Sequence, residues 1–213
     1  MFSAYLFDFD GTLVNSMPTF GAMALRVLDE NQIPYGEDII KIVTPLGYGG
    51  MARYFRELGI DMEEGALIAK MISYVTEDYR ERIEAKSNVV EGLKALKEKG
   101  ASLNVLTASP HSVLDPCLKR LGIYDLFDNV WSSDDLGTIK ADPKIYAIAA
   151  ERIGKPIEEI LFVDDNLGAC QSASKSGIGT CGIYDPSSED YVDQIKQAAD
   201  HYVYDFSELL EVE

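Results

Sequence analysis

The stretch that decides the fold is residues 4–12, with the sequence AYLFDFDGT. Its apolar and aromatic beginning is typical of a short strand buried on both faces, which we expect over residues 5–9. Side chains two positions apart point to the same side of a strand, so Asp8 and Asp10 leave it together, about 7 Å apart. Two carboxylates this close repel each other unless a cation or a proton intervenes. Gly11 then permits a tight turn and the close approach of a ligand to the backbone.

Length and composition describe a globular but strongly acidic chain. With 213 residues and 46% hydrophobic side chains, we expect one large domain or two small ones around a real core. The net charge of −17 disfavours nucleic acid and anionic membranes as partners, because both need basic patches. No stretch reaches the roughly 18 apolar residues of a membrane span. Residues 1–13 lack the basic start of a signal peptide, so we expect a cytoplasmic protein.

The cysteines and histidines are few and scattered. Cys117, Cys170 and Cys181 are expected to be small buried apolar side chains rather than parts of a disulfide framework or a zinc site. His111 and His201 have no histidine-rich context, which argues against a histidine-based metal site.

Residues 15–86 have a mostly helical pattern and contain no convincing buried strand. Apolar residues recur at three- and four-residue spacings over residues 20–28 and again over residues 66–83, which predicts an amphipathic helix in each place. Between them, the glycine-rich residues 44–50 are predicted to form a loop and residues 51–58 a short helix.

From residue 88 onward, short apolar runs alternate with helical patterns that end at glycine. Strands are predicted over residues 103–106, 129–131, 160–163, 180–183 and 202–204. Helices are predicted over residues 90–99, 111–121, 143–153, 169–176 and 191–199. This alternation favours an α/β fold, a Rossmann-like parallel sheet with helices on both faces. Residues 1–14 and 87–213 would form this core, and residues 15–86 an inserted all-helical cap domain.

Polar side chains follow several of the predicted strands. Ligands of open α/β sheets bind at the carboxyl ends of the strands, and the first strand delivers its two aspartates there. The next delivers residues 107–109, Thr-Ala-Ser, whose hydroxyls and free amides at a helix start suit a phosphate. A later strand delivers residues 164–165, Asp-Asp, and Lys140 precedes another helix. Each has an ordinary explanation as a helix cap or a solvated charge, but together they place carboxylates, a hydroxyl and one cation at one sheet edge.

Residues 8–12, Asp-Phe-Asp-Gly-Thr, resemble the Asp-x-Asp-Gly-Thr signature of the haloacid dehalogenase-like superfamily, most of whose members are phosphatases. The family has three further motifs. In this chain they are matched by Thr107 after an apolar strand, by Lys140 before a proline-started helix, and by the acidic pair at residues 164–165. Ala141 stands where the family usually has a proline. The resemblance covers nearly the whole chain. The helical insertion is similar to the cap found in the branch of the family that contains phosphoglycolate phosphatases and β-phosphoglucomutases.

The resemblance implies a mechanism and a cofactor. Asp8 would attack phosphorus and form an aspartyl-phosphate, while Asp10 exchanges protons with the leaving group and with water. The phosphate would be held by Thr107, the amide of Ala108 and Lys140. The implied cofactor is Mg²⁺. Its implied ligands are Asp8, the backbone carbonyl of Asp10, Asp165 and, in a supporting role, Asp164.

Three functions compete under this resemblance. Hydrolysis of a small phosphomonoester is favoured, because dehalogenases and phosphonate hydrolases of the superfamily lack an aspartate at the position of Asp10. A phosphomutase of the β-phosphoglucomutase type is the alternative, although such enzymes carry a histidine near the position of Phe20. A receiver-like regulatory module is more remote, since receivers are small and have no cap.

The substrate is expected to be a small phosphorylated metabolite: a sugar phosphate, phosphoglycolate or a nucleotide monophosphate. Substrate choice should lie in the cap, which closes over such sites. The candidate substrate-facing residues are Gly47, Tyr48 and Arg53, although an ordinary glycine-rich connection explains that stretch equally well. Either a monomer or a homodimer is compatible with the sequence.

Overall fold

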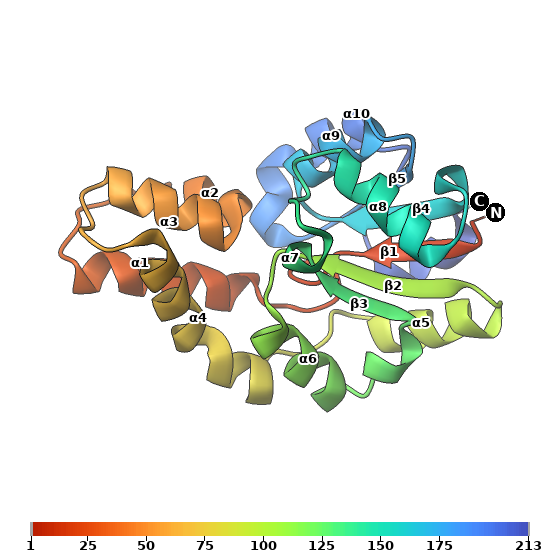
Figure 1. Cartoon of the computed structure of the whole chain (residues 1–213), viewed down its shortest axis with the longest axis horizontal. Coiled ribbons are helices and arrows are strands. Elements are labelled where there is room, and N and C mark those ends of the chain that lie inside the picture. Colours follow the sequence, from red (N-terminus) through yellow and green to blue (C-terminus); the bar gives the residue numbers. More distant parts are fainter. Residues whose placement is uncertain (1, 213) are drawn as a thin grey trace.

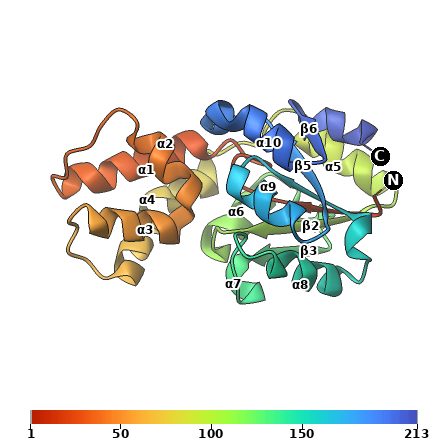
Figure 2. The same ribbon diagram turned by 90° about the horizontal axis from the view of Figure 1, so that it is seen from above.

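The computed structural model describes residues 2–212 and shows two parts side by side (Figure 1). One part is a parallel sheet covered by helices, which we call the core. The other consists of four helices, α1–α4, which we call the helical arm. Both termini lie at the end of the core that is farthest from the arm, and the view from above shows the same arrangement (Figure 2).

The core sheet has six parallel strands in the order β3-β2-β1-β4-β5-β6. The strands are β1 (Ala4–Phe7), β2 (Ser102–Thr107), β3 (Asn129–Ser132), β4 (Ile160–Asp164), β5 (Gly179–Ile183) and β6 (His201–Val203). The central strand β1 lies between β2 and β4, with Phe7 opposite both Val105 and Val163. Because all strands run the same way, their carboxyl ends meet at one edge.

Strand β1 is shorter than the predicted residues 5–9. The amide of Asp8 still donates to the Val163 carbonyl, but the Phe9 carbonyl accepts from the amides of Leu13 and Val14. This turn takes the Phe9 backbone away from the sheet, and the strand ends at Phe7.

Helices cover both faces of the sheet, which confirms the predicted fold class. The core helices are α5 (Val89–Glu98), α6 (His111–Arg120), α7 (Ser133–Leu136), α8 (Lys144–Ile153), α9 (Leu167–Ser174) and α10 (Val192–Ala198). Successive residues of β1 point to opposite faces, so Tyr5 and Phe7 pack into one buried cluster while Ala4 and Leu6 pack into the other. Side chains of α5 and α6 complete the first cluster, and those of α8 and α9 the second.

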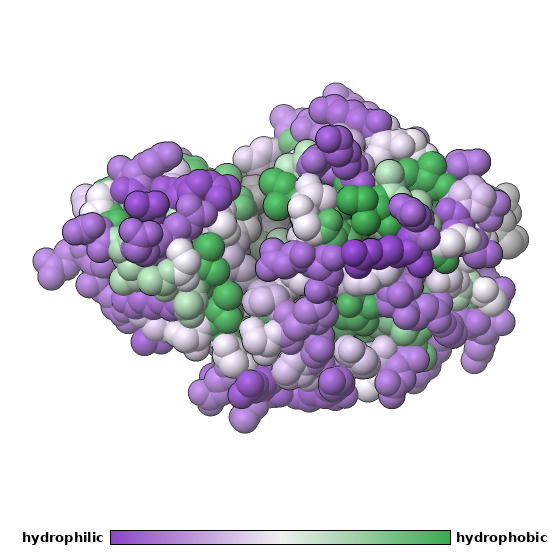
Figure 3. Space-filling model, in the orientation of Figure 1, coloured by the Kyte–Doolittle hydropathy of each residue, from purple (hydrophilic) through white to green (hydrophobic). Residues whose placement is uncertain are grey.

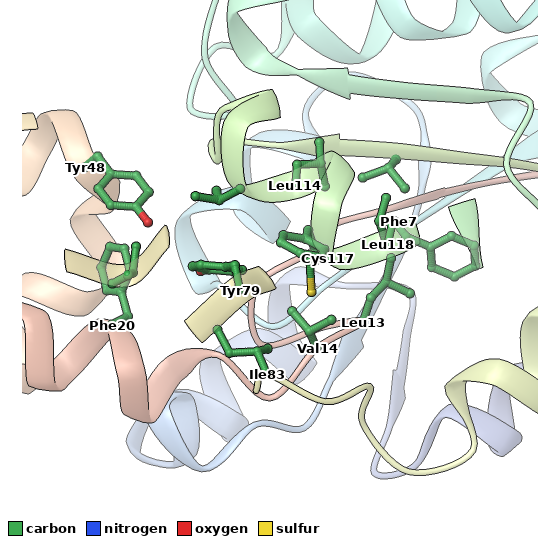
Figure 4. Packing of buried hydrophobic residues seen from close by; sticks show 14 of the residues in the cluster. Phe7, Leu13, Val14, Phe20, Tyr48, Tyr79, Ile83, Leu114, Cys117 and Leu118 are labelled. Carbon is green, nitrogen blue, oxygen red and sulfur yellow. The ribbon is translucent and has the colours of Figure 1, made fainter. Parts of the chain in front are cut away.

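The helical arm comprises α1 (Met17–Glu30), α2 (Ile39–Val43), α3 (Gly47–Glu57) and α4 (Glu64–Glu81). Its longest helix, α4, packs against α6 of the core, and the first buried cluster continues from the arm into the core through this contact (Figure 4). An ion pair between Lys41 of α2 and Asp190 of the core joins the two parts at a second place. The exact domain limits at residues 15–86 stay a prediction.

The prediction of a loop over residues 44–50 is wrong. Thr44–Leu46 form a 3₁₀ turn and α3 begins directly at Gly47. The buried side chains of α3 are Tyr48, Met51, Ala52 and Phe55. This spacing places one apolar stripe against the rest of the arm, and that burial outweighs the low helix propensity of the three glycines.

The three cysteines are free and buried, as expected. Among residues 2–212, no helix is both long and apolar enough to cross a membrane.

Candidate active site

Four of the predicted site residues meet at the carboxyl edge of the sheet. Asp8 follows β1, Asp164 ends β4, Asp165 comes next in the chain, and Lys140 lies on the segment between α7 and α8. The core and the helical arm leave a notch between them on the molecular surface (Figure 3).

Lys140 joins the ends of two strands. Its ammonium lies 2.7 Å from Asp8 Oδ1 and 2.7 Å from Asp164 Oδ2. Burial alone would lower the pKa of Lys140, but the carboxylates of Asp164 and Asp8 outweigh it and raise the pKa well above its usual value. The lysine therefore stays charged and provides a fixed cation in an otherwise acidic site.

The three buried carboxylates of Asp8, Asp164 and Asp165 each offer an oxygen, and these oxygens lie within 4.8 Å of one another. Burial and then the neighbouring carboxylates of Asp164 and Asp8 raise the pKa of Asp165 well above its usual value. Burial also raises the pKa of Asp164 to about 6, although Lys140 opposes this shift. The cluster is thus short of positive charge even with the lysine present.

Gly11 and Thr12 support this cluster from the turn after β1. Gly11 has φ of +78°, and a Cβ at this position would lie 2.6 Å from Asp165 Oδ2. Only glycine fits both the backbone conformation and the space. The Thr12 hydroxyl donates to Asp165 Oδ1 at 3.1 Å.

Asp10 is held by three hydroxyl groups from separate parts of the chain. Its Oδ1 accepts from Ser16 at 2.6 Å and from Tyr79 of α4, and its Oδ2 accepts from Ser109 at 2.5 Å. Burial and the charge of Asp8 raise the pKa of Asp10, and the three hydroxyls oppose this shift. The helical arm therefore reaches directly into the site through Tyr79.

The predicted phosphate-binding residues lie at the end of β2. Thr107 is buried, and its hydroxyl accepts from the Ser109 amide at 3.0 Å, which closes a tight turn around the exposed Ala108. Ser133 of α7 donates to the Thr107 carbonyl at 3.0 Å and fixes the turn from the other side.

The predicted residues of the arm take different places. Gly47 faces the turn at residues 107–109, because a Cβ built on it would lie 3.9 Å from the Ala108 Cβ. Tyr48 is buried next to it. Arg53 is not brought to this site: it forms an ion pair with Glu64 at 3.0 Å, and its side chain is 61% exposed.

Sequence reasoning missed Lys86, which lies in the segment that returns from the arm to the core. Its ammonium donates to the carbonyls of Gly11 at 2.6 Å and Tyr184 at 2.7 Å, and to the buried Asp185 carboxylate at 2.9 Å. A single lysine before a helix carries no pattern that marks it in the sequence. Lys86 ties this returning segment to the turn that carries the aspartates.

Comparison with known proteins agrees with this geometry. The family model described as haloacid dehalogenase-like hydrolase matches residues 5–183. The chain belongs to this family.

Its relatives include a phosphoglycolate phosphatase of Thiobacillus denitrificans, which is 32% identical over 181 residues, covering 82% of this chain and 79% of that protein. Pyrophosphatase PpaX of Bacillus velezensis is 29% identical over 182 residues, covering 85% and 82%. A crystal structure of a predicted phosphoglycolate phosphatase from Haemophilus somnus superposes with a TM-score of 0.82 at 26% identity, covering 99% of this chain and 97% of that one.

Proposed function

We propose that this family member is a Mg²⁺-dependent phosphatase that hydrolyses a small phosphomonoester through an aspartyl-phosphate on Asp8. The observation that carries the proposal is the buried group formed by Lys140, Asp8, Asp164 and Asp165 at one sheet edge. The named activities of the relatives, a phosphoglycolate phosphatase and a pyrophosphatase, support phosphate chemistry in the same family.

The acidic cluster fits a magnesium ion. Its donors are hard carboxylate oxygens, which Mg²⁺ prefers, and the raised pKa of Asp165 indicates that its charge is poorly balanced without a cation. Asp8 and Asp165 would hold the ion together with the Asp10 carbonyl. Asp164 already accepts from Lys140 and from the Asn166 amide at 2.7 Å each, so its role would be to support. Bound Mg²⁺ would neutralise charge on the phosphate and on the attacking carboxylate.

In the first step, an Asp8 carboxylate oxygen attacks phosphorus and the ester P–O bond breaks. Asp10 gives its proton to the leaving alkoxide, so that a neutral alcohol departs. Lys140, the Thr107 hydroxyl and the Ala108 amide hold the equatorial oxygens during the transfer. The lysine is suited to this because its partners keep it charged.

In the second step, water attacks the phosphorus of the aspartyl-phosphate. Asp10, now deprotonated, takes a proton from this water, and the P–O bond to Asp8 breaks to release inorganic phosphate. The hydroxyls of Ser16, Tyr79 and Ser109 fix the Asp10 carboxylate between the steps. Such positioning is worth several kcal/mol when a catalytic group is kept in reacting geometry.

The mutase alternative would need a histidine near the position of Phe20, and the side chain at this position does not support it. Phe20 is buried and packs edge-on against Tyr48, with 5.0 Å between ring centroids. The chain has only two histidines, His111 and His201, and both belong to the core segments. The phosphatase function is therefore preferred, and a cytoplasmic site of action remains part of the proposal.

Release of phosphate from an aryl phosphate, with and without Mg²⁺, tests the proposal. We expect Mg²⁺-dependent turnover that falls by at least about 10³-fold in Asp8→Asn, while Asp61→Asn, a change at an exposed arm residue, leaves it intact. Calorimetric titration should show weaker Mg²⁺ binding by Asp165→Asn. Undiminished turnover in Asp8→Asn, or equal turnover without a divalent ion, would contradict the proposal.

A further inference from the structure

The turn that carries the aspartates is held by a side chain from outside the site. Within the turn, the Gly11 amide donates to the Val14 carbonyl at 3.0 Å. The Gly11 carbonyl takes no part in this bond and accepts from the Lys86 ammonium at 2.6 Å instead. One side of the turn is therefore fixed by a lysine of the segment that returns from the helical arm.

Lys86 uses its whole ammonium group for this kind of contact. A lysine has three N–H donors, and here they meet the carbonyls of Gly11 and Tyr184 and the carboxylate of Asp185. Two of the three acceptors are backbone carbonyls, one after β1 and one after β5. The side chain therefore joins two loops of the sheet edge, and no N–H is left to bind a phosphate.

The lysine is itself fixed at both ends. Its amide donates to the Leu13 carbonyl at 3.0 Å, where the two connections between arm and core pair in antiparallel fashion. At its tip, the side chain of Asp185 is only 2% exposed, and the second oxygen of this carboxylate accepts from the amide and the hydroxyl of Ser187. A side chain held in this way can fix the position of the Gly11 carbonyl.

The Gly11 backbone lies directly against Asp165. A Cβ at Gly11 would be 2.6 Å from Asp165 Oδ2, and the Thr12 hydroxyl donates to Asp165 Oδ1 at 3.1 Å. The bond from Lys86 fixes the plane of the peptide group between Gly11 and Thr12. A rotation of this peptide group would disturb both contacts to Asp165 and the neighbouring carbonyl of Asp10.

We propose that Lys86 is a positioning residue of the proposed magnesium site. Through the Gly11 carbonyl, it holds the turn in the shape that lets Asp8, Asp10 and Asp165 share one Mg²⁺ ion. This inference rests on the proposed phosphatase function and adds a residue of the arm connection to it. Removal of an outer group that orients metal ligands typically lowers metal affinity by about 10- to 100-fold.

The charge of Lys86 acts in the opposite direction. The lysine is a cation bonded to the turn that packs against the acidic cluster, and like charges repel. Loss of this charge alone would tighten Mg²⁺ binding, whereas loss of the bond to the turn would weaken it. The sign of the change in Mg²⁺ affinity therefore separates positioning from a simple charge effect.

Calorimetric titration of the whole chain with Mg²⁺ tests the inference. Lys86→Met keeps an apolar side chain of similar length but removes the donors, and we expect the Kd for Mg²⁺ to rise at least about 10-fold. Lys94→Met removes a lysine charge at an exposed position of α5 and should leave this Kd unchanged. An unchanged or lower Kd in Lys86→Met overturns the inference.

A double variant separates positioning from general stability. Lys86→Met alone leaves the buried Asp185 carboxylate without a counter-charge, and adding Asp185→Asn removes that charge. Urea denaturation should show that stability is partly restored in the double variant. Its Kd for Mg²⁺ should stay raised by about 10-fold, because the Gly11 carbonyl still lacks its donor. If the Kd returns to the wild-type value together with stability, Lys86 acts only on the fold and the inference is wrong.

Turnover of an aryl phosphate by Lys86→Met gives a second readout. The Mg²⁺ concentration for half-maximal turnover should rise together with the Kd. At saturating Mg²⁺, the KM for the aryl phosphate should stay within about 2-fold of the wild-type value, because Lys86 has no N–H free for the substrate. A raised KM with unchanged Mg²⁺ dependence would contradict the inference.

The outcomes keep the two proposals apart. If the wild type binds Mg²⁺ and hydrolyses the aryl phosphate, and Lys86→Met has the same Mg²⁺ affinity, only the inference about Lys86 is overturned. If the wild type hydrolyses no phosphate in the presence of Mg²⁺, the phosphatase function is overturned and this inference with it.

Discussion

At the scale of single residues, Lys86 links the segment that returns from the helical arm to the turn that follows β1. Its partner Asp185 has a side chain only 2% exposed, and the other oxygen of that carboxylate is bonded to Ser187. In Lys86→Met, one carboxylate oxygen would stay buried without a counter-charge. We expect the free energy of unfolding, measured by urea denaturation, to fall by roughly 2–4 kcal/mol.

The matched control for this change is Lys94→Met, at an exposed position of α5, which should shift stability by less than about 0.5 kcal/mol. Adding Asp185→Asn to Lys86→Met should restore part of the loss, since it removes the orphaned charge. If the Lys86 and Lys94 variants unfold at the same urea concentration, Lys86 has no structural role.

His111 provides a pH-dependent contact just after the turn at residues 107–109. Its Nδ1 lies 2.7 Å from Asp115 and its Nε2 2.7 Å from Asp135 of α7. The hydrogen bond to Asp115, helped by Asp135 and opposed by burial, raises the pKa of His111. A group whose pKa is higher in the folded than in the unfolded state stabilises the fold when it is protonated. This stabilisation is complete at pH values below the unfolded-state pKa, and it disappears as the pH rises through the folded-state pKa.

We therefore expect His111→Gln to be less stable than the wild type below about pH 6, by no more than about 1 kcal/mol because the ring is partly exposed. The difference should vanish at more alkaline pH. Urea unfolding over a pH series measures it, and a difference that is constant with pH would refute the ion pairs.

At the scale of elements, helix α5 shows packing that overrides helix propensity. A Cβ added to Gly92 would lie 2.5 Å from the Phe206 ring. Gly92→Ala gains up to about 1 kcal/mol in propensity but overpacks this contact at a cost of roughly 1–3 kcal/mol. We expect a net loss of stability in thermal unfolding.

Gly65→Ala in the first turn of α4 is the control, because a Cβ there meets nothing within 4 Å. This change should be neutral or should stabilise by up to about 1 kcal/mol. A more stable Gly92→Ala would show that α5 and Phe206 are not in close contact.

The elements also show what a sequence can and cannot predict. Short apolar runs with stop glycines mark the alternating strands and helices, and parallel topology brings Asp8, Lys140 and Asp165 to one edge. Most of helix α3 was predicted, over residues 51–58, but its first turn was taken as a loop because the glycines there obscure an apolar stripe that is recognised only once the helix is packed. The hydroxyls on Asp10 come from Ser16, Tyr79 and Ser109, which no local pattern connects.

At the scale of the whole molecule, one buried cluster runs from the helical arm into the core. It includes Val27 and Met71 of the arm as well as Val105 and Val163 of the sheet. Shared burial of this kind couples the two parts, whereas the exposed Lys41–Asp190 pair adds little. We expect arm and core to unfold in a single transition.

The single tryptophan makes this testable, since Trp131 lies in β3 of the core and the arm is entirely helical. Urea unfolding followed by Trp131 fluorescence and by far-ultraviolet circular dichroism should give superimposable curves. Loss of helical signal before the tryptophan signal would mean that the arm unfolds independently.

The central claim is that Asp8 carries the phosphoryl group. The most direct measurement is rapid acid quenching during turnover of a phosphate-labelled substrate, followed by peptide mapping. We predict label on the peptide that contains Asp8, present with Mg²⁺ and absent in Asp8→Asn. Turnover without labelled protein, or label on a peptide from another part of the chain, would contradict the account.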